Sequence, residues 1–195
     1  MIDGDVLLQI YMAGHFPMWD PDSETISLYE PDPRAVIEFD SFHIPRRLQE
    51  RARTQPFRLS SDEAFVEVFD QCHLQREDGT WMHPELRKGY LELHERGFAH
   101  SIEAWKDDVL VGGLYGVHIG AAFMGESMFS RPELGGTDAS KICLIETVRR
   151  LKDRGFELFD IQYPNPHVEQ FKYVQLSAEV YAQQLARSIA QPRDW

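Results

Sequence analysis

Gly125-Glu126-Ser127-Met128-Phe129-Ser130 combines a carboxylate, a thioether and two hydroxyls within six residues. The stretch follows an apolar run, Val109 to Met124, that several glycines interrupt. If the chain is extended here, Met124, Glu126 and Met128 share one face of a strand, because side chains alternate between the two faces. One acid between two adaptable thioethers suits a pocket. The alternative is a strand end with a solvated glutamate, and periodicity alone favours that alternative.

The composition predicts a folded chain in a reducing compartment. With 195 residues and 43% hydrophobic content, the chain can bury a substantial core. Cys72 and Cys143 lie in apolar helical patterns without a CxxC partner. We therefore expect buried thiols and no disulfide. Because glycines interrupt the longest apolar run, we expect no membrane span and a cytoplasmic protein.

The charge is unevenly distributed along the chain. A net charge of −12 argues against bulk nucleic-acid binding, which needs many cations, and favours a neutral or cationic partner. The segment from Arg46 to Arg58 is locally basic, with five arginines against the single acid Glu50. A solvated helix face is the simplest explanation of such a run.

Residues 1–58 are predicted to form a small N-terminal domain of short elements joined by prolines. A helix from Asp5 to Tyr11 ends at Gly14. His15 to Trp19 is predicted as an aromatic loop. Short strands follow at 26–29 and 36–39, a turn lies at 31–34, and Pro45 opens a helix.

Residues 59–195 show a more regular pattern, which predicts the second and larger domain. Ser60 and Glu63 have the spacing of a capping box before a helix. Helical periodicity predicts helices at 64–72, between Pro84 and Gly97, at 138–154 and at 177–189. Strand patterns cover 98–105, 109–117, 119–124 and 156–162. This order predicts an α+β fold on a mixed, mostly antiparallel sheet flanked by helices.

Asp160 and Gln162 form the second polar feature that the pattern isolates. They share a face at the end of the strand from Phe156 to Gln162, after two apolar residues. Buried polar groups need partners, and a buried carboxylate in a cleft is a candidate base. A structural pair that anchors the following Pro-Asn-Pro turn explains the pattern equally well.

Other chemical motifs are weak or lacking in the sequence. His94-Glu95 lacks the second histidine of an HExxH zinc helix, and neither a Walker loop nor a Gly-x-Ser-x-Gly elbow occurs. The segment from Arg131 to Gly136 is vaguely similar to an acyl-CoA pyrophosphate loop, but its spacing differs by one residue.

An ordered set of short strings resembles the leucyl/phenylalanyl-tRNA–protein transferase family. From roughly Gly4 to His167 these are Phe16-Pro17, Pro31-Asp32-Pro33-Arg34, Gly79-Thr80-Trp81, His100-Ser101-Ile102-Glu103, Gly112 to Val117, Gly125 to Ser130, Ala139-Ser140-Lys141 and Asp160-Ile161-Gln162. The resemblance implies a small N-terminal domain followed by a GNAT-related, acetyltransferase-like catalytic domain. It also implies a monomer that needs neither metal nor CoA.

The implied reaction is aminolysis of an aminoacyl ester. The α-amine of a protein N-terminus, Arg or Lys, attacks leucyl- or phenylalanyl-tRNA (or the methionyl ester), and the product carries a bacterial N-degron. The implied partners are thus the 3′ acceptor end of aminoacyl-tRNA and the N-terminus of an acceptor protein. Asp160 polarises Gln162 or accepts the proton from the attacking amine.

The resemblance also assigns roles to further residues. Glu126 joins Asp160 and Gln162 in the catalytic group, close to an amine. The implied substrate-binding residues are Met128, Met124, Leu114, Trp81, Tyr29 and Ser127, of which Trp81 and Tyr29 stack on the terminal adenosine or shape the pocket mouth. The implied tRNA-phosphate contacts are Arg46, Arg47, Arg51 and Arg53.

Two segments depart from the family pattern. The segment from Val168 to Leu176 replaces a Ser-Leu-Gly-Ala stretch and an Ile-Pro-Arg, and Pro132 to Thr137 resembles an insertion. Donor or acceptor preference can therefore differ from that of the family. Two alternatives stay open: a GNAT-like or Fem-like transferase with another donor or acceptor, and a non-catalytic binder of basic N-termini.

Overall fold

The computed structural model describes residues 2–20, 23–54, 56–74 and 83–195. Its centre is a seven-stranded sheet in the order β4-β5-β6-β7-β8-β3-β9. The strands are β3 (Arg34–Ile37), β4 (Arg58–Ser61), β5 (Ala99–Lys106), β6 (Val109–Ile119), β7 (Ala122–Ser130), β8 (Leu158–Gln162) and β9 (Val174–Leu176). Among these described strands, only β7 and β8 pair in parallel. The predicted α+β fold with a mixed, mostly antiparallel sheet is confirmed.

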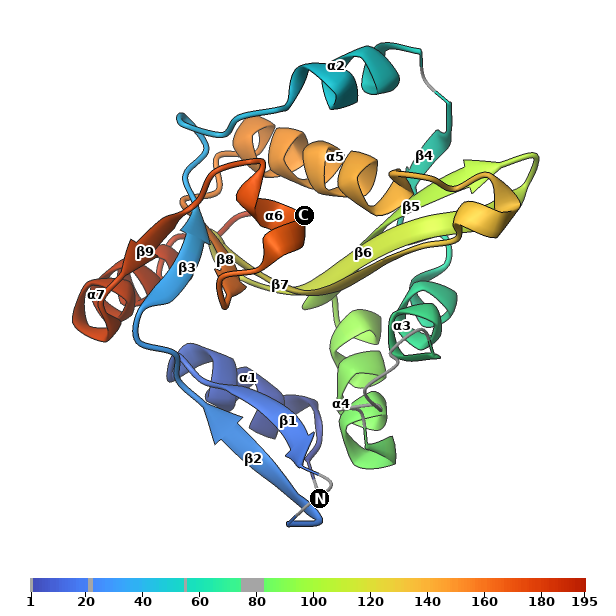
Figure 1. The fold of residues 1–195 in the computed structure, drawn as a ribbon. Coiled ribbons are helices and arrows are strands. Elements are labelled where there is room, and N and C mark those ends of the chain that lie inside the picture. Colours follow the sequence, from blue (N-terminus) through green and yellow to red (C-terminus); the bar gives the residue numbers. More distant parts are fainter. Residues whose placement is uncertain (1, 21–22, 55, 75–82) are drawn as a thin grey trace.

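Helices cover both faces of this sheet (Figure 1). One face packs against α1 (Gly4–Met12), α3 (Phe65–Leu74), α4 (Pro84–Glu95) and α7 (Ala178–Ile189), and the other against α2 (Arg46–Arg53), α5 (Ala139–Asp153) and α6 (Pro166–Glu169). A 3₁₀ turn, η1 (Pro132–Leu134), precedes α5. Each face has its own apolar core, as expected for a sheet buried on both sides.

The start of the chain forms a helix and a hairpin below the main sheet (Figure 1). Strand β1 (Phe16–Asp20) pairs antiparallel with β2 (Thr25–Tyr29). The prediction that His15 to Trp19 is a loop is therefore wrong. A proline at position 17 obscured the strand in the sequence, but an edge strand tolerates proline because it need not donate at that position.

A second local prediction is also wrong. Ser60 and Glu63 do not cap a helix, because Ser60 lies in β4 and its hydroxyl donates to the Glu103 carboxylate at 2.5 Å. Glu63 instead accepts a hydrogen bond from Arg58 at 2.8 Å. Pairing of β4 with β5 outweighs the local capping pattern.

The main sheet contains strands from both sides of the predicted division at residue 58. Strand β3 lies between β8 and β9 and pairs antiparallel with each. The division into residues 1–58 and 59–195 stays a prediction. The pairing of β3 shows that residues 34–37 complete the same sheet that carries Asp160.

Within the described residues, no helix is long and apolar enough to cross a membrane.

Candidate functional site

The candidate site lies where β7 and β8 stop pairing. Their parallel register covers Ala122–Leu158, Phe123–Phe159 and Met124–Asp160, and no pair follows. Beyond this point residues of both strands line a pocket with a volume of about 570 Å³. The split therefore exposes side chains of two central strands that would otherwise be covered by the neighbouring strand.

A β-bulge in β7 presents Glu126 to this site. Gly125 is opposite Gly116 and Ser127 is opposite Tyr115, so Glu126 is an extra residue in the strand. The extra residue shifts by one the order in which side chains point to the two faces of the sheet. As a result, Met124 packs in the core of the α1/α4 face, whereas Met128 packs against the core of the α5 face. The expectation that Met124, Glu126 and Met128 share one face is therefore wrong for Met128.

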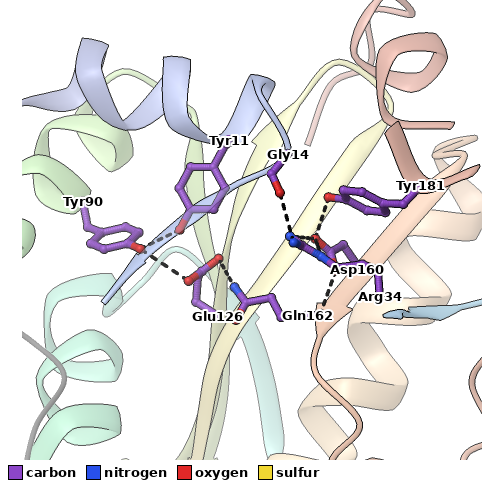
Figure 2. Close-up of polar contacts among 8 residues, drawn as sticks. All are labelled: Tyr11, Gly14, Arg34, Tyr90, Glu126, Asp160, Gln162 and Tyr181. Carbon is purple, nitrogen blue, oxygen red and sulfur yellow. Dashed lines mark hydrogen bonds and ion pairs between the residues drawn. The ribbon is translucent and has the colours of Figure 1, made fainter. Parts of the chain in front are cut away.

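Asp160 is the most firmly held group of the site (Figure 2). Its carboxylate, 0% exposed, accepts hydrogen bonds from Arg34 Nε at 3.0 and 3.1 Å and from Arg34 Nη2 at 2.6 Å. The Tyr181 hydroxyl donates to it at 2.8 Å. Burial, followed by the charge of Asp160, raises the pKa of Tyr181, so this hydroxyl keeps its proton and remains a donor.

Gln162 connects Asp160 to Glu126. Its backbone N–H donates to Asp160 Oδ1 at 2.7 Å, and its side-chain Nε2 donates to Glu126 Oε1 at 2.9 Å. Gln162 has a φ of 65°, a left-handed conformation that residues with a Cβ seldom adopt. Such conformations are often found at functional sites, where the surroundings hold them.

Glu126 lies between Gln162 and two buried tyrosines (Figure 2). The Tyr90 hydroxyl donates to Glu126 Oε2 at 3.3 Å, and the Tyr11 and Tyr90 hydroxyls lie 2.5 Å apart. Glu126 is only partly exposed, and its removal from water raises its pKa from 4.5 to about 7. The nearby Tyr11 hydroxyl and the hydrogen bond from Gln162 oppose this rise. A carboxyl that titrates near neutrality can exchange a proton under working conditions.

The pocket beside Glu126 has an apolar part and a polar part. Its apolar lining consists of Leu114, Met128, Leu144, Phe159, Ile161 and Val168. Ser130, Ser140, Lys141 and Asp138 form the polar part at the start of α5, where Ser130 Oγ accepts a hydrogen bond from the Ser140 N–H at 2.9 Å. The apolar part suits an aliphatic or aromatic side chain, with Glu126 and Gln162 beside it.

Several residues implied as substrate-binding can be placed. Leu114 pairs with Met128 across β6 and β7, and both line the pocket together with Ser127. Met124 is 1% exposed and belongs to the core rather than to the pocket lining. Tyr29 stacks on Phe16, with ring centroids 6.0 Å apart. Trp81 lies outside the described residues.

The four arginines implied as tRNA contacts lie on α2, next to the start of α5. Arg46 and Arg47 have side chains 91% and 68% exposed. Arg47 Nη2 donates to Asp138 Oδ1 at 3.0 Å, and Arg51 Nε lies 3.9 Å from Asp138 Oδ2. Arg53 is exposed at the end of the helix. Part of the positive charge of α2 is therefore already balanced by one buried acid.

Sequence reasoning missed four residues that hold the site together: Arg34, Tyr11, Tyr90 and Tyr181. Each belongs to an element other than β7 and β8. The string Pro31-Asp32-Pro33-Arg34 within the family resemblance was the one available sign of Arg34, and the tyrosines looked like ordinary helix-face residues. Among the described residues, no group of three or more His, Cys, Asp or Glu could hold a metal ion.

Comparison with known proteins identifies one family. A family model described as leucyl/phenylalanyl-tRNA protein transferase matches residues 36–186. A leucyl/phenylalanyl-tRNA–protein transferase of Salinibacter ruber is 41% identical over 98% of this chain and 82% of its own length. One of Akkermansia muciniphila is 43% identical over 95% of each chain.

Solved structures show a more distant likeness. A ribosomal-protein-alanine N-acetyltransferase from Brucella melitensis covers 67% of this chain and 90% of its own, at 12% identity and a TM-score of 0.40. L-PGS from Bacillus licheniformis covers 82% of this chain and 65% of its own, at 14% identity and a TM-score of 0.48.

Proposed function

Because the chain belongs to the leucyl/phenylalanyl-tRNA–protein transferase family, we propose that it transfers an aminoacyl group from aminoacyl-tRNA to the N-terminal α-amine of an acceptor protein. The donor carries leucine, phenylalanine or methionine, and the acceptor begins with Arg or Lys. The product is a protein with a new N-terminal residue that an N-degron pathway recognises. The enzyme acts in the cytoplasm.

The bond changes define what the site must do. The amine nitrogen attacks the ester carbonyl carbon, a peptide bond forms, and the ester C–O bond to the terminal ribose breaks. The amine loses a proton, and the departing ribose oxygen gains one. Because the ester is already activated, the protein contributes mainly by orienting the two reactants, which can be worth an effective molarity of ~10⁵ M or more.

The contact between Glu126 and Gln162 carries this proposal. Glu126, with a pKa of about 7, accepts the proton from the attacking amine. Gln162 donates its Nε2 to Glu126, and this orientation turns Oε1 toward an N–H of the same amine. The negative charge at Glu126 also attracts the α-amine to the site, where the amine attacks in its neutral form. The donor side chain occupies the apolar pocket between Leu114, Met128 and Ile161.

Asp160 takes a supporting role in this proposal. Its carboxylate is fully buried and already accepts hydrogen bonds from Arg34, Tyr181 and the Gln162 backbone. Of the two roles that the resemblance implied for Asp160, polarising Gln162 fits these contacts better than accepting the proton. The tRNA body lies along α2, where Arg46, Arg47, Arg51 and Arg53 face its phosphates.

The test is a donor-by-acceptor matrix with purified protein. Leucyl-, phenylalanyl- and methionyl-tRNA, together with acetyl-CoA, are each offered to peptides that differ only in their first residue: Arg, Lys, Ala or Glu. We expect transfer from the three aminoacyl-tRNAs to Arg and Lys peptides. Turnover with the CoA ester alone, or peptide binding without any transfer, would replace this proposal with one of its alternatives.

A further inference from the structure

Asp160 has no hydrogen-bonding capacity left for a substrate. Four donor groups point at it: Arg34 Nε, whose single N–H is shared between the two carboxylate oxygens, Arg34 Nη2, the Tyr181 hydroxyl and the Gln162 backbone N–H. A carboxylate has about four lone-pair sites, so these donors occupy them all. The influence of Asp160 on the reaction must therefore pass through the residues that it holds.

One of those residues is held in an unfavourable backbone conformation. Gln162 has a φ of 65°, and the 2.7 Å bond from its N–H to Asp160 Oδ1 closes the turn that keeps it there. This backbone conformation directs the Gln162 side chain toward Glu126, where Nε2 donates at 2.9 Å (Figure 2). Without the bond to Asp160, the backbone would relax toward an ordinary extended conformation and the side chain would turn away.

Asp160 is in turn held from two distant parts of the chain. Arg34 comes from β3, and its remaining guanidinium nitrogen, Nη1, donates to the Gly14 carbonyl at 3.0 Å. The guanidinium lies 4.4 Å from the Tyr181 ring centroid and 5.0 Å from that of Phe16, within cation–π distance of both. The Arg34 side chain is 1% exposed, so its position leaves little freedom to Asp160.

We propose that Arg34 and Tyr181 are positioning residues of the transfer reaction, acting through Asp160 to hold Gln162 against Glu126. The proposal rests on the proposed function. It assigns to β3 and α7 an indirect part in orienting the reacting amine, through Asp160 and Gln162. It also predicts that the effect of each residue on turnover depends on the Gln162 side chain.

Tyr181→Phe is the sharpest single variant, because it removes one hydroxyl and keeps the ring beside Arg34. Misplacement of a reacting group by up to about one ångström can lower the reaction rate by up to ~100-fold. We therefore expect kcat to fall by ~10- to ~100-fold. The KM values for aminoacyl-tRNA and for the Arg peptide should change by less than about twofold, since a positioning effect appears in kcat. Wild-type kcat in Tyr181→Phe would overturn the proposal.

A double-mutant cycle separates positioning from general damage. In a Gln162→Ala background, Tyr181→Phe should cause no further loss of kcat, because the group that it positions is gone. Thr147→Val is the matched control: it deletes another fully buried hydroxyl, which donates to the Cys143 carbonyl in α5, and should leave kcat unchanged in both backgrounds. Losses that multiply in the double variant would contradict the proposal.

A spectroscopic measurement tests the same contact without relying on turnover. The Gln162 side-chain NH₂ resonance, assigned by its loss in Gln162→Ala, should be sharp in the wild-type protein and should shift or broaden in Tyr181→Phe and in Arg34→Lys. Arg34→Lys keeps the positive charge but loses the planar guanidinium that donates from two nitrogens to the Asp160 carboxylate. An unchanged resonance in a folded Tyr181→Phe protein would overturn the positioning role. A wild-type protein inactive with every aminoacyl-tRNA would instead overturn the proposed function.

Discussion

Glu126 is the residue whose protonation state matters most at the proposed site. Its pKa of about 7 arises mainly because protein replaces water around the carboxylate. The transfer rate should therefore rise with pH through about 7, as the carboxylate becomes available to accept the amine proton. Glu126→Gln should remove this inflection and lower kcat by ~10²- to ~10⁴-fold. A pH–rate profile with saturating substrates checks both effects.

The raised pKa of Glu126 also predicts that the free energy of unfolding falls as the pH rises, whereas the transfer rate increases. A carboxyl whose folded pKa is raised contributes stability that is fully present below 4.5 and is lost as pH rises through about 7. The loss amounts to about 3 kcal/mol at most, at 1.36 kcal/mol per pKa unit. Urea unfolding at pH 5 and pH 8 should show this decline in wild type and not in Glu126→Gln. Equal declines in both proteins would contradict the assignment to Glu126.

Tyr11 tunes Glu126 from the N-terminal helix. Its hydroxyl, which is hydrogen-bonded to Tyr90, lowers the pKa of Glu126 and so opposes the effect of burial. Tyr11→Phe should shift the inflection of the pH–rate profile to a higher pH. Tyr29→Phe, which changes an aromatic group outside this hydrogen-bonded cluster, provides the comparison and should keep the wild-type inflection.

Arg34 and Asp160 form the buried ion pair on which the site rests. Removing one partner leaves an unpaired buried charge, which typically costs about 3–5 kcal/mol. Arg34→Met should lower the free energy of unfolding by this amount, and adding Asp160→Leu should restore much of it without restoring transfer. Denaturant unfolding of the three variants measures this. A double variant no more stable than Arg34→Met would show that packing, not charge, causes the loss.

At the level of elements, the bulge in β7 decides which face Met128 occupies. Gly116 lies opposite Gly125 at the bulge, and a Cβ at Gly116 would overlap the Met124 carbonyl and the Phe123 ring. Gly116→Ala should therefore displace Glu126 and reduce both stability and transfer. Gly125→Ala is the milder substitution, since its Cβ would meet Phe159 Cε2 at 3.0 Å, whereas a Cβ at Gly116 would lie 2.3 Å from the Met124 carbonyl oxygen. Urea unfolding and single-turnover rates should show the larger loss in Gly116→Ala.

Helix α2 gives a second prediction at this scale. Each arginine that contacts a tRNA phosphate should contribute about one unit to the slope of log affinity against log salt. Arg46→Ala and Arg53→Ala should each weaken binding and reduce this slope. Arg58→Ala is the control, because Arg58 lies on β4 and pairs with Glu63 at 2.8 Å. Unchanged slopes in the α2 variants would place the tRNA surface elsewhere.

For the whole molecule, the position of β3 makes the two ends of the chain interdependent. A fragment of residues 59–195 would lack β3, so β8 and β9 would lose their shared neighbour and Asp160 its cation. We expect this fragment to unfold, and residues 1–58 added in trans to restore structure. Circular dichroism and urea titration of the fragment decide this. Cooperative unfolding of the fragment alone would favour two independent domains divided at residue 58.

Much of the fold could be predicted from local patterns. The helices at 84–95, 139–153 and 178–189 and the strands at 99–106 and 109–119 follow from periodicity and from glycine or proline boundaries. Near-continuous apolar strands are expected where a sheet is buried on both faces. The Asp160–Gln162 pair was visible because polar groups at the end of such a strand are unusual.

The order of the long helices and strands from α3 to β8, the family and the candidate trio Glu126, Asp160 and Gln162 could be predicted from the chain alone, because these depend on residue identity at short spacing. Only the tertiary structure decided how the trio works. A single extra residue at the bulge placed Met128 on the other face, and Arg34 and Tyr181 reached Asp160 from 126 and 21 residues away. Long-range hydrogen bonds and burial set these contacts and the pKa of Glu126, and neither leaves a periodic trace in the chain.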